Sequence, residues 1–288
     1  PLCGRDFEYF SEDPYLAGKM AAGYVRGIQS NGIAACPKHF AVNSQELRRM
    51  ASDSVLDERT LREIYLTGFE IVVKESAPKT IMSSYNLVNG TYANENAHLL
   101  QEILRKDWGF TGAVVTDWGG SNDHALGVKN GSTLEMPAPG GDAVRELLAA
   151  VQSGKISEAD VDARLDELLT LVLDTSAAVQ KHSRSFDADA HHALARRAAA
   201  ESAVLLKNDG GILPLAAGAR VAVIGDFAET PRYQGAGSSA VNSIKVDTLL
   251  DCLAQSGLQC AGFAAGFDRQ GRPDADKKAQ AVALAQKA

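Results

Sequence analysis

The sequence predicts an α/β protein: the C-terminal part of a (β/α)8 TIM-like barrel, followed by the beginning of an α/β sandwich domain. Short apolar segments alternate with amphipathic helical segments up to about residue 180, which indicates parallel βα units. This rhythm restarts after a polar, aperiodic stretch, AAVQKHSRSFDADA. A closed barrel needs eight strands and about 250 residues. We therefore expect a partial barrel domain over residues 1–176, a linker over 177–190 and a partial sandwich domain over 191–288.

The elements of the first domain follow from hydrophobic periodicity and from helix stop signals. The first expected helix ends at Asn31-Gly32, and the apolar run IAACPKHF then reads as a buried strand. The expected helices cover residues 14–29, 57–74, 98–108, 142–152 and 158–173. The expected strands cover residues 33–40, 80–86, 112–118 and 133–137. Since four strands are half of a barrel, we expect the chain to lack the other half.

The second domain opens with the same kind of alternation. Helices are expected over residues 190–202, 248–256 and 275–287, and strands over 204–207, 220–225 and 259–263. The sequence stops on a helix where the pattern calls for another strand. We expect this domain to be incomplete as well.

Composition excludes several kinds of partner. The chain of 288 residues has 29 Lys and Arg against 36 Asp and Glu, a net charge of −7, without a block of like charges. Nucleic acid and membrane are therefore not expected partners, and no apolar run approaches the roughly 18 residues of a membrane span. The four cysteines, Cys3, Cys36, Cys252 and Cys260, lack CxxC spacing, so we expect neither zinc nor a redox pair. Cys252 and Cys260 could pair, but we favour the interpretation that they are small buried hydrophobes.

Chemistry-bearing side chains stand at the carboxyl ends of the expected barrel strands. In a parallel barrel this end carries the active site. The residues selected by this rule are Lys38, His39, Tyr85, Asn86, Asp117, Trp118 and Glu135. Together they combine hydrogen-bonding groups with an aromatic plate, which is typical of a site for a neutral polyol such as a sugar.

Each of these residues also has a structural interpretation. Asp117 could cap the following turn, His39 could be a hydrogen-bonded core histidine, and Lys38 could extend into solvent. For Glu135 a structural role is favoured over a catalytic one. The shared placement at strand ends is what favours a site.

Several long motifs resemble glycoside hydrolase family 3, in the form of the bacterial two-domain β-glucosidases. They are GRDFEYFSEDP (4–14), KHFAVNSQELRRM (38–50), DERTLREIYLTGFE (57–70), MSSYNLVNG (82–90), LLQEILRKDWGFTGAVVTDWGG (99–120), LEMP (134–137) and RYQGAGSS (232–239). The resemblance covers essentially the whole chain in unbroken order. It implies a hydrolase of carbohydrate metabolism that needs no cofactor.

The resemblance also implies roles for individual residues. Asp117, before Trp in the TDW element, corresponds to the nucleophile of the family. The implied substrate-binding residues, most of them in the −1 subsite, are Arg5, Lys38, His39, Arg49, Tyr85, Trp118 and Ser238. The loop RYQGAGSS faces the sugar site in the family, which is why Ser238 or its neighbour Ser239 is expected to contact substrate.

The expected reaction is retaining, exo-acting hydrolysis of terminal β-D-glucosyl residues. A retaining enzyme needs an ionised carboxylate as nucleophile and a protonated carboxylic acid to assist the leaving group. In two-domain members of the family the acid is a glutamate of the second domain. Glu201 and Glu229 are the second-domain glutamates here, and neither lies in a matching motif. We therefore expect the acid to lie outside this sequence.

Two departures from family patterns bear on this expectation. The single-domain branch uses a His–Asp pair in a KHFPGHG element, whereas this chain has KHFAVNS. The family pattern AGxDLEMP reads NGSTLEMP here, with Thr133 where Asp is usual. That difference should affect local hydrogen bonding and leave the nucleophile unchanged.

Three alternatives remain open. A β-xylosidase of the same family is the nearest, although such members often carry Cys where this chain has Trp118. A sugar-binding fragment without catalysis is the second, because the acid is missing. The third is a nucleotide-binding protein, suggested by VAVIGD and QGAGSS, although Pro231 intervenes and GxGxxG is absent. The expected partner is a small-molecule β-glucoside or oligosaccharide. Oligomeric state and compartment are left open by the sequence.

Overall fold

The computed structural model describes residues 3–181, 185–235 and 237–288. The chain divides into two compact units, Pro1–Arg184 and Ser185–Ala288, each of which is mixed α/β. The division falls within the expected linker 177–190. Helix α6 runs on to Val179 and α7 begins at Ala188, so the helices extend into both ends of that stretch. Residues 182–184 of the expected linker lie outside the described residues.

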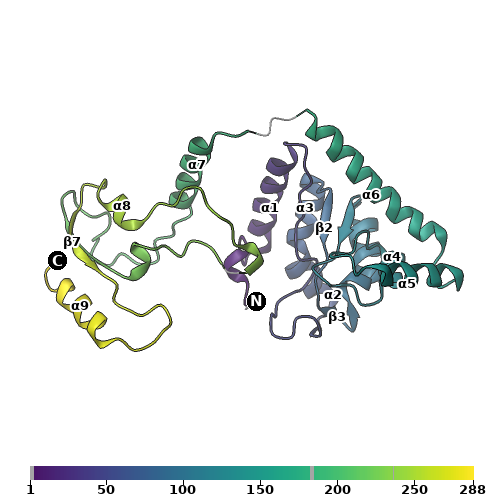
Figure 1. Cartoon of the computed structure of the whole chain (residues 1–288), viewed down its shortest axis with the longest axis horizontal. Coiled ribbons are helices and arrows are strands. Elements are labelled where there is room, and N and C mark those ends of the chain that lie inside the picture. Colours follow the sequence, from purple (N-terminus) through teal and green to yellow (C-terminus); the bar gives the residue numbers. More distant parts are fainter. Residues whose placement is uncertain (1–2, 182–184, 236) are drawn as a thin grey trace. The chain divides into compact units, whose positions relative to one another are not determined.

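The first unit contains short strands framed by helices (Figure 1). The strands are β1 (Asp53–Ser54), β2 (Thr80–Met82), β3 (Leu87–Val88), β4 (Thr91–Tyr92) and β5 (Ala113–Val115). The helical elements are η1 (Asp6–Glu8), α1 (Pro14–Gln29), α2 (Glu58–Thr60), η2 (Leu61–Leu66), α3 (Thr67–Ser76), η3 (Ala93–Glu95), η4 (His98–Asp107), α4 (His124–Asn130), α5 (Gly141–Gln152) and α6 (Glu158–Val179).

Helix α1 has the predicted bounds, and its start has a clear local cause. The Asp13 carboxylate accepts hydrogen bonds from the backbone N–H groups of Tyr15 and Leu16, and Pro14 occupies the first turn. Figure 1 shows α1 lying alongside α3. The Cβ of a residue replacing Gly18 would lie 2.9 Å from the Ile71 side chain, so glycine permits this close approach.

The parallel pair β2–β5 lies at the centre of the first unit. Its register places Thr80 opposite Ala113 and Met82 opposite Val115. Residues 33–40 run beside β2 and bond to it through Thr80 N to Ala35 O and Phe40 N to Met82 O. Val115 also bridges to Leu134 in parallel orientation. Four adjacent parallel segments therefore order the unit as the barrel prediction requires.

The structure corrects the predicted strands at three places. Residues 33–40 are extended but, all being described, include only an isolated bridge at Phe40, because Pro37 has no N–H to donate and the segment pairs on one side. Residues 133–137 form only the Leu134 bridge before Pro137. Residues 204–207, likewise described, form no strand, and Leu206 is 92% exposed.

The helix predicted over 57–74 divides into α2, the π-helical turn η2, and α3. The Thr67 hydroxyl lies 2.9 Å from the carbonyl oxygen of Arg62 and 2.8 Å from that of Glu63, and so satisfies carbonyls that the wider turn leaves open. The segment predicted over 98–108 is π-helical as well. Periodicity located both segments but could not reveal that their hydrogen bonds span five residues instead of four.

The core of the first unit forms between the strands and helices η2, α3 and η4. Phe40 is fully buried and meets the rings of Phe69 and Trp108 edge to face, with centroids 5.2 and 5.9 Å apart. On α6 the predicted apolar stripe is only partly covered. Leu165 and Leu169 remain 48% and 47% exposed.

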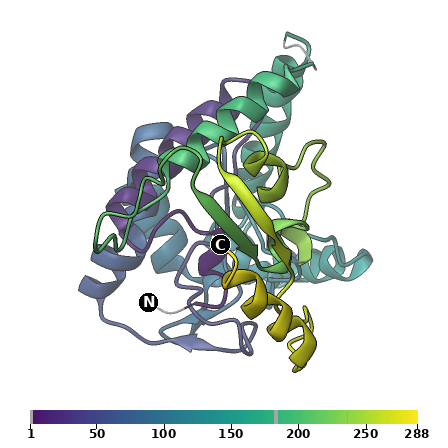
Figure 2. The same cartoon turned by 90° about the vertical axis from the view of Figure 1, so that its left-hand side faces the viewer.

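The second unit contains α7 (Ala188–Glu201), β6 (Arg220–Ile224), η5 (Asp226–Ala228), η6 (Gly237–Ser239), α8 (Leu249–Leu253), β7 (Gln259–Ala264) and α9 (Ala275–Ala285). Figure 2 shows the parallel strands β6 and β7 side by side. Val223, Ala228 and Leu253 form its small core. All four cysteines are free, so Cys252 and Cys260 do not pair, and Cys260 is exposed, so the prediction that it is buried is wrong.

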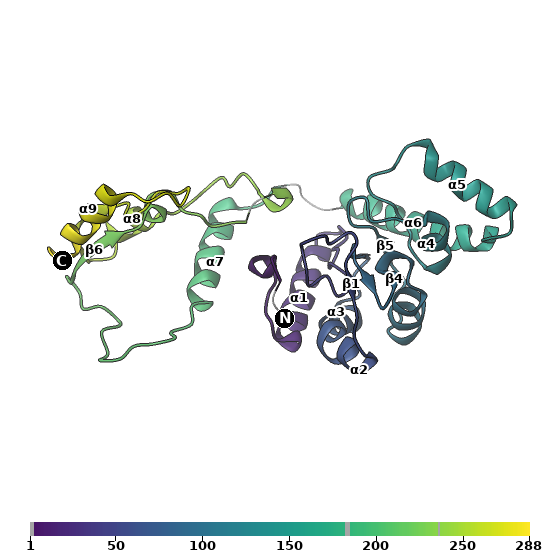
Figure 3. The same ribbon diagram turned by 90° about the horizontal axis from the view of Figure 1, so that it is seen from below.

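A buried ion-pair network joins α6 to the strands. Glu167 lies 2.8 Å from Arg105 and 2.7 Å from Arg164, and accepts a hydrogen bond of 2.6 Å from the Thr133 hydroxyl. Burial lowers the pKa of Arg105 to about 10. Thr133, the departure from the family pattern, thus takes part in this network. Figure 3 shows α4, α5 and α6 grouped together at this side of the unit.

We predict that Glu167→Ala lowers the free energy of unfolding of the first unit by about 3 kcal/mol, because it leaves two largely buried guanidinium groups unpaired. Urea unfolding measures the change. Asp166→Ala, one position earlier on the exposed face of α6, is the matched control and should cost about 0.5 kcal/mol or less. Equal losses in the two variants would show that the network does not stabilise the unit.

Candidate active site

The site is centred on Asp117, two residues beyond strand β5. Its side chain is 14% exposed. One carboxylate oxygen, Oδ1, accepts a hydrogen bond of 2.7 Å from the backbone N–H of Trp118. The other, Oδ2, is buried and has no hydrogen-bond partner within the described part of the chain. It faces Nε2 of His39 at 3.4 Å. A buried carboxylate oxygen with an unused lone pair is available to a ligand or to a reacting atom.

His39 arrives from the neighbouring parallel segment and is 4% exposed. Its Nδ1 lies 3.1 Å from the Tyr9 hydroxyl, and its Nε2 lies 3.5 Å from the Arg5 guanidinium. Burial is the largest influence on the ring and lowers its pKa to about 4, although the Asp117 charge acts in the opposite direction. Near neutral pH the ring is therefore uncharged and carries one proton.

Tyr85 and Arg49 form the other side of the site. The Tyr85 hydroxyl donates a hydrogen bond of 2.8 Å to the carbonyl of Trp118, and the Arg49 guanidinium lies 4.7 Å from the centre of the Tyr85 ring. Burial and the charge of Asp117 raise the pKa of Tyr85. Its hydroxyl therefore stays protonated and continues to donate. The indole of Trp118 is 63% exposed and offers an apolar plate at the entrance.

Six of the eight residues predicted for the site form one connected set. Contacts run from Arg5 to His39, on to Asp117 and Trp118, and then through Tyr85 to Arg49. Lys38 is exposed and directly precedes His39. The positive charge of Lys38 helps to lower the pKa of His39. Ser238 lies in η6 of the second unit, so its contact with the site stays a prediction.

Sequence reasoning missed the partners that hold these residues. Tyr9 reaches His39, Glu8 forms an ion pair with Arg5, and Glu46 lies 2.8 Å from Arg49. The two acidic partners stand three residues from their arginines, a spacing that could have indicated the pairs. No pattern in the sequence indicates the contact of Tyr9, which joins residues 30 positions apart.

Glu95 was also missed, and it holds the loop beyond Trp118. Its side chain is 6% exposed, and Oε1 accepts hydrogen bonds from the backbone N–H groups of Asn122 and Asp123, at 2.9 and 2.6 Å. Glu135 lies 3.2 Å from Nδ1 of His124, and its Oε2 is buried without a hydrogen-bond partner among the described residues, so the structural role expected for it stays a prediction. Gly119 N–H donates to the carbonyl of the adjacent Met136 at 2.7 Å, which joins that segment to the Asp117 loop.

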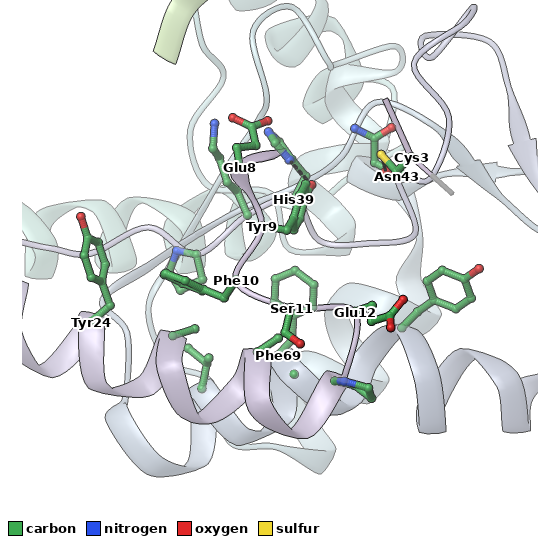
Figure 4. A pocket seen from close by; sticks show the side chains of 18 of the residues that line it. Cys3, Glu8, Tyr9, Phe10, Ser11, Glu12, Tyr24, His39, Asn43 and Phe69 are labelled. Carbon is green, nitrogen blue, oxygen red and sulfur yellow. Dashed lines mark hydrogen bonds between the residues drawn. The ribbon is translucent and has the colours of Figure 1, made fainter. Parts of the chain in front are cut away.

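A cavity of about 630 Å³ adjoins the site on the α1 side of His39 (Figure 4). Apolar and aromatic side chains of α1, α3 and the segment before α1 line it, among them Phe10, Tyr24 and Phe69. His39 and Tyr9 belong to its wall. In the described parts of the chain, no group of three or more His, Cys, Asp and Glu could hold a metal ion, and no helix is long and apolar enough to cross a membrane.

The fold and site together define an α/β protein of TIM-like barrel type with a candidate site centred on a carboxylate. The glycosyl hydrolase family 3 N terminal domain matches residues 1–171, and the glycosyl hydrolase family 3 C-terminal domain matches residues 203–288. The chain belongs to glycoside hydrolase family 3.

Its relatives are longer enzymes. It is 47% identical to thermostable beta-glucosidase B of Acetivibrio thermocellus over 257 residues, which cover 89% of this chain and 34% of that protein. It is 45% identical to an exo-alpha-(1->6)-L-arabinopyranosidase of Bifidobacterium breve, covering 100% of this chain and 39% of that protein. The chain therefore spans between a third and two fifths of the length of these relatives.

Solved structures show the same fold. A family 3 beta-glucosidase of Bifidobacterium adolescentis matches with a TM-score of 0.91 and 45% identity, covering 98% of this chain and 41% of that one. Beta-glucosidase 3B of Thermotoga neapolitana in complex with glucose matches with a TM-score of 0.85 and 36% identity, covering 100% and 39%. These matches confirm the fold class and the family that the motifs predicted.

The pKa of His39 predicts a pH dependence of stability. The ordinary value is 6.5 and the folded value is about 4, so the unfolded chain binds a proton in this range that the folded chain does not. The stabilising contribution is therefore complete above about pH 6.5 and is lost as the pH falls toward 4. Denaturant unfolding at several pH values measures it. His39→Gln, which cannot titrate, should show a smaller decline, and an unchanged decline would contradict the assignment.

Proposed function

We propose that this chain is part of a retaining, exo-acting β-glycosidase that hydrolyses terminal β-D-glucosyl residues, with Asp117 as its nucleophile. The observation that carries the proposal is the Asp117 carboxylate just beyond a parallel strand, whose buried Oδ2 has no hydrogen-bond partner among the described residues and lies 3.4 Å from Nε2 of His39. The names of the family relatives support the substrate class, because most of those compared are beta-glucosidases.

In the proposed reaction, Asp117 attacks the anomeric carbon while the bond from that carbon to the leaving oxygen breaks. A protonated carboxylic acid gives its proton to that oxygen, and water later releases the sugar from Asp117. The neutral His39 ring and the guanidinium groups of Arg5 and Arg49 would donate to sugar hydroxyls. These donors would hold the sugar in place, while hydrogen bonds to its 2-hydroxyl strengthen in the transition state.

We propose that the acid is a glutamate outside this sequence. The greater length of the relatives supports this, as does the absence of a family-like setting around Glu201 and Glu229. A second carboxyl group in a retaining enzyme lies about 5–5.5 Å from the nucleophile. If the acid were absent from the functional protein, hydrolysis of unactivated glucosides would fall by about 10²–10⁴-fold, and a sugar-binding role would result.

The nucleophile is tested with 2-deoxy-2-fluoro-β-glucosyl fluoride and peptide mass mapping. Fluoride leaves with little acid assistance, and the 2-fluorine slows release, so an adduct should accumulate on Asp117. We expect Asp117→Asn to abolish the label. Glu135→Gln, the matched control at another strand end, should keep it. A label that persists in Asp117→Asn, or that maps to another residue, would overturn the assignment.

The choice of sugar is a separate proposal. We expect the glucosyl fluoride to label faster than the 2-fluoroxylosyl analogue, because Trp118 offers an indole where β-xylosidases of the family often have Cys. Trp118→Cys should slow glucosyl labelling about fivefold, the loss expected for an aromatic contact of roughly 1 kcal/mol. The arabinopyranosidase relative justifies an α-L-arabinopyranosyl substrate in the same series. Faster labelling by the xylosyl reagent would favour the β-xylosidase alternative.

A further inference from the structure

Tyr9 is joined to the proposed nucleophile by a short chain of polar contacts. Its hydroxyl lies 3.1 Å from Nδ1 of His39, and Nε2 of the same ring lies 3.4 Å from Oδ2 of Asp117. The imidazole ring thus stands between a phenol and a carboxylate. Figure 4 shows Tyr9 and His39 next to each other on the wall of the cavity. Because a neutral ring carries one proton on one of two nitrogens, its partners decide which atom holds it.

We propose that Tyr9 is a positioning residue: its hydroxyl donates to Nδ1 of His39 and places the ring proton on Nε2, the nitrogen that lies 3.4 Å from Oδ2 of Asp117. The importance of this arrangement for catalysis rests on the proposed function, whereas the arrangement itself does not. It places an N–H, and not a lone pair, on the side of the buried Asp117 oxygen that has no hydrogen-bond partner among the described residues.

The opposite tautomer fits the contacts less well. In it, Nδ1–H would donate to the Tyr9 oxygen and Arg5 would donate to Nε2. Arg5 lies 3.5 Å from Nε2, the outer limit of a hydrogen bond, and is already engaged in an ion pair with Glu8. The lone pair of Nε2 would then face the Asp117 carboxylate at 3.4 Å, which places two acceptors against each other.

The charged and titratable groups around the ring agree with this choice. Burial raises the pKa of Tyr9 to about 12, so its hydroxyl keeps the proton that it donates. The charges of Lys38 and Arg5 disfavour a second proton on the ring, while those of Asp117 and Glu8 favour it. Burial of the ring outweighs them, and near neutral pH one nitrogen is protonated.

The tautomer of His39 can be measured by nitrogen-15 NMR of the histidine side chains near neutral pH. Protonated and unprotonated ring nitrogens have well-separated chemical shifts, and the His39 signals are identified by their loss in His39→Gln. We expect Nε2 to show the shift of a protonated nitrogen and Nδ1 that of an unprotonated one. If Nδ1 carries the proton in the unaltered chain, the proposal is wrong. This outcome does not depend on any variant or on activity.

The variant Tyr9→Phe provides a second test of the proposal by the same NMR measurement. It removes one oxygen from a residue that is 41% exposed, so the ring packing is kept. We expect the shifts of the two His39 nitrogens to converge as both tautomers become populated. Tyr24→Phe, a tyrosine of the same cavity wall that is 64% exposed, is the matched control and should leave the shifts unchanged. Unchanged shifts in Tyr9→Phe would overturn the proposal. Labelling of Asp117 by the fluoro sugar tests the proposed function separately.

Discussion

The parallel pairing of β2 with β5 is the constraint on which the site depends. Its register aligns Met82 with Val115, and the flanking segments 33–40 and 133–137 run in the same direction. The residues that follow the carboxyl ends of adjacent parallel strands lie at the same edge of the sheet. His39, Tyr85 and Asp117 consequently meet there although they come from three segments. The buried core around Phe40 and Ile81 keeps these segments in place.

At that edge the carboxylate of Asp117 is surrounded by hydrogen-bond donors, some neutral and some positively charged. Neutral His39 faces Asp117 directly, whereas the guanidinium groups of Arg5 and Arg49 are partly neutralised by Glu8 and Glu46. This distribution offers several hydrogen-bond donors, which agrees with the neutral sugar that we propose as substrate. The exposed Trp118 indole would offer an apolar surface to the face of that sugar.

Local patterns in the sequence predicted most of the order of elements and part of the candidate site, whereas Arg5 and Arg49 came from the family resemblance. Helix α1 was predicted to the residue from its helical spacing and the Asn31-Gly32 stop signal, and strand-end placement selected His39, Tyr85 and Asp117. Strand lengths were overestimated where pairing depends on neighbours, as in 33–40. Tyr9 could not be found, since its contact with His39 comes only from folding. The π-helical turns, too, depend on packing that periodicity does not record.

The central claim is that Asp117 is the nucleophile that forms a bond to the sugar. Azide rescue of Asp117→Gly tests this claim most directly. The small cavity left by the variant admits azide, which attacks an activated aryl β-glucoside in place of the carboxylate. The account predicts formation of α-glucosyl azide, because a single displacement inverts the anomeric centre. Formation of β-glucosyl azide would contradict it, since that product identifies the altered residue as the acid rather than the nucleophile.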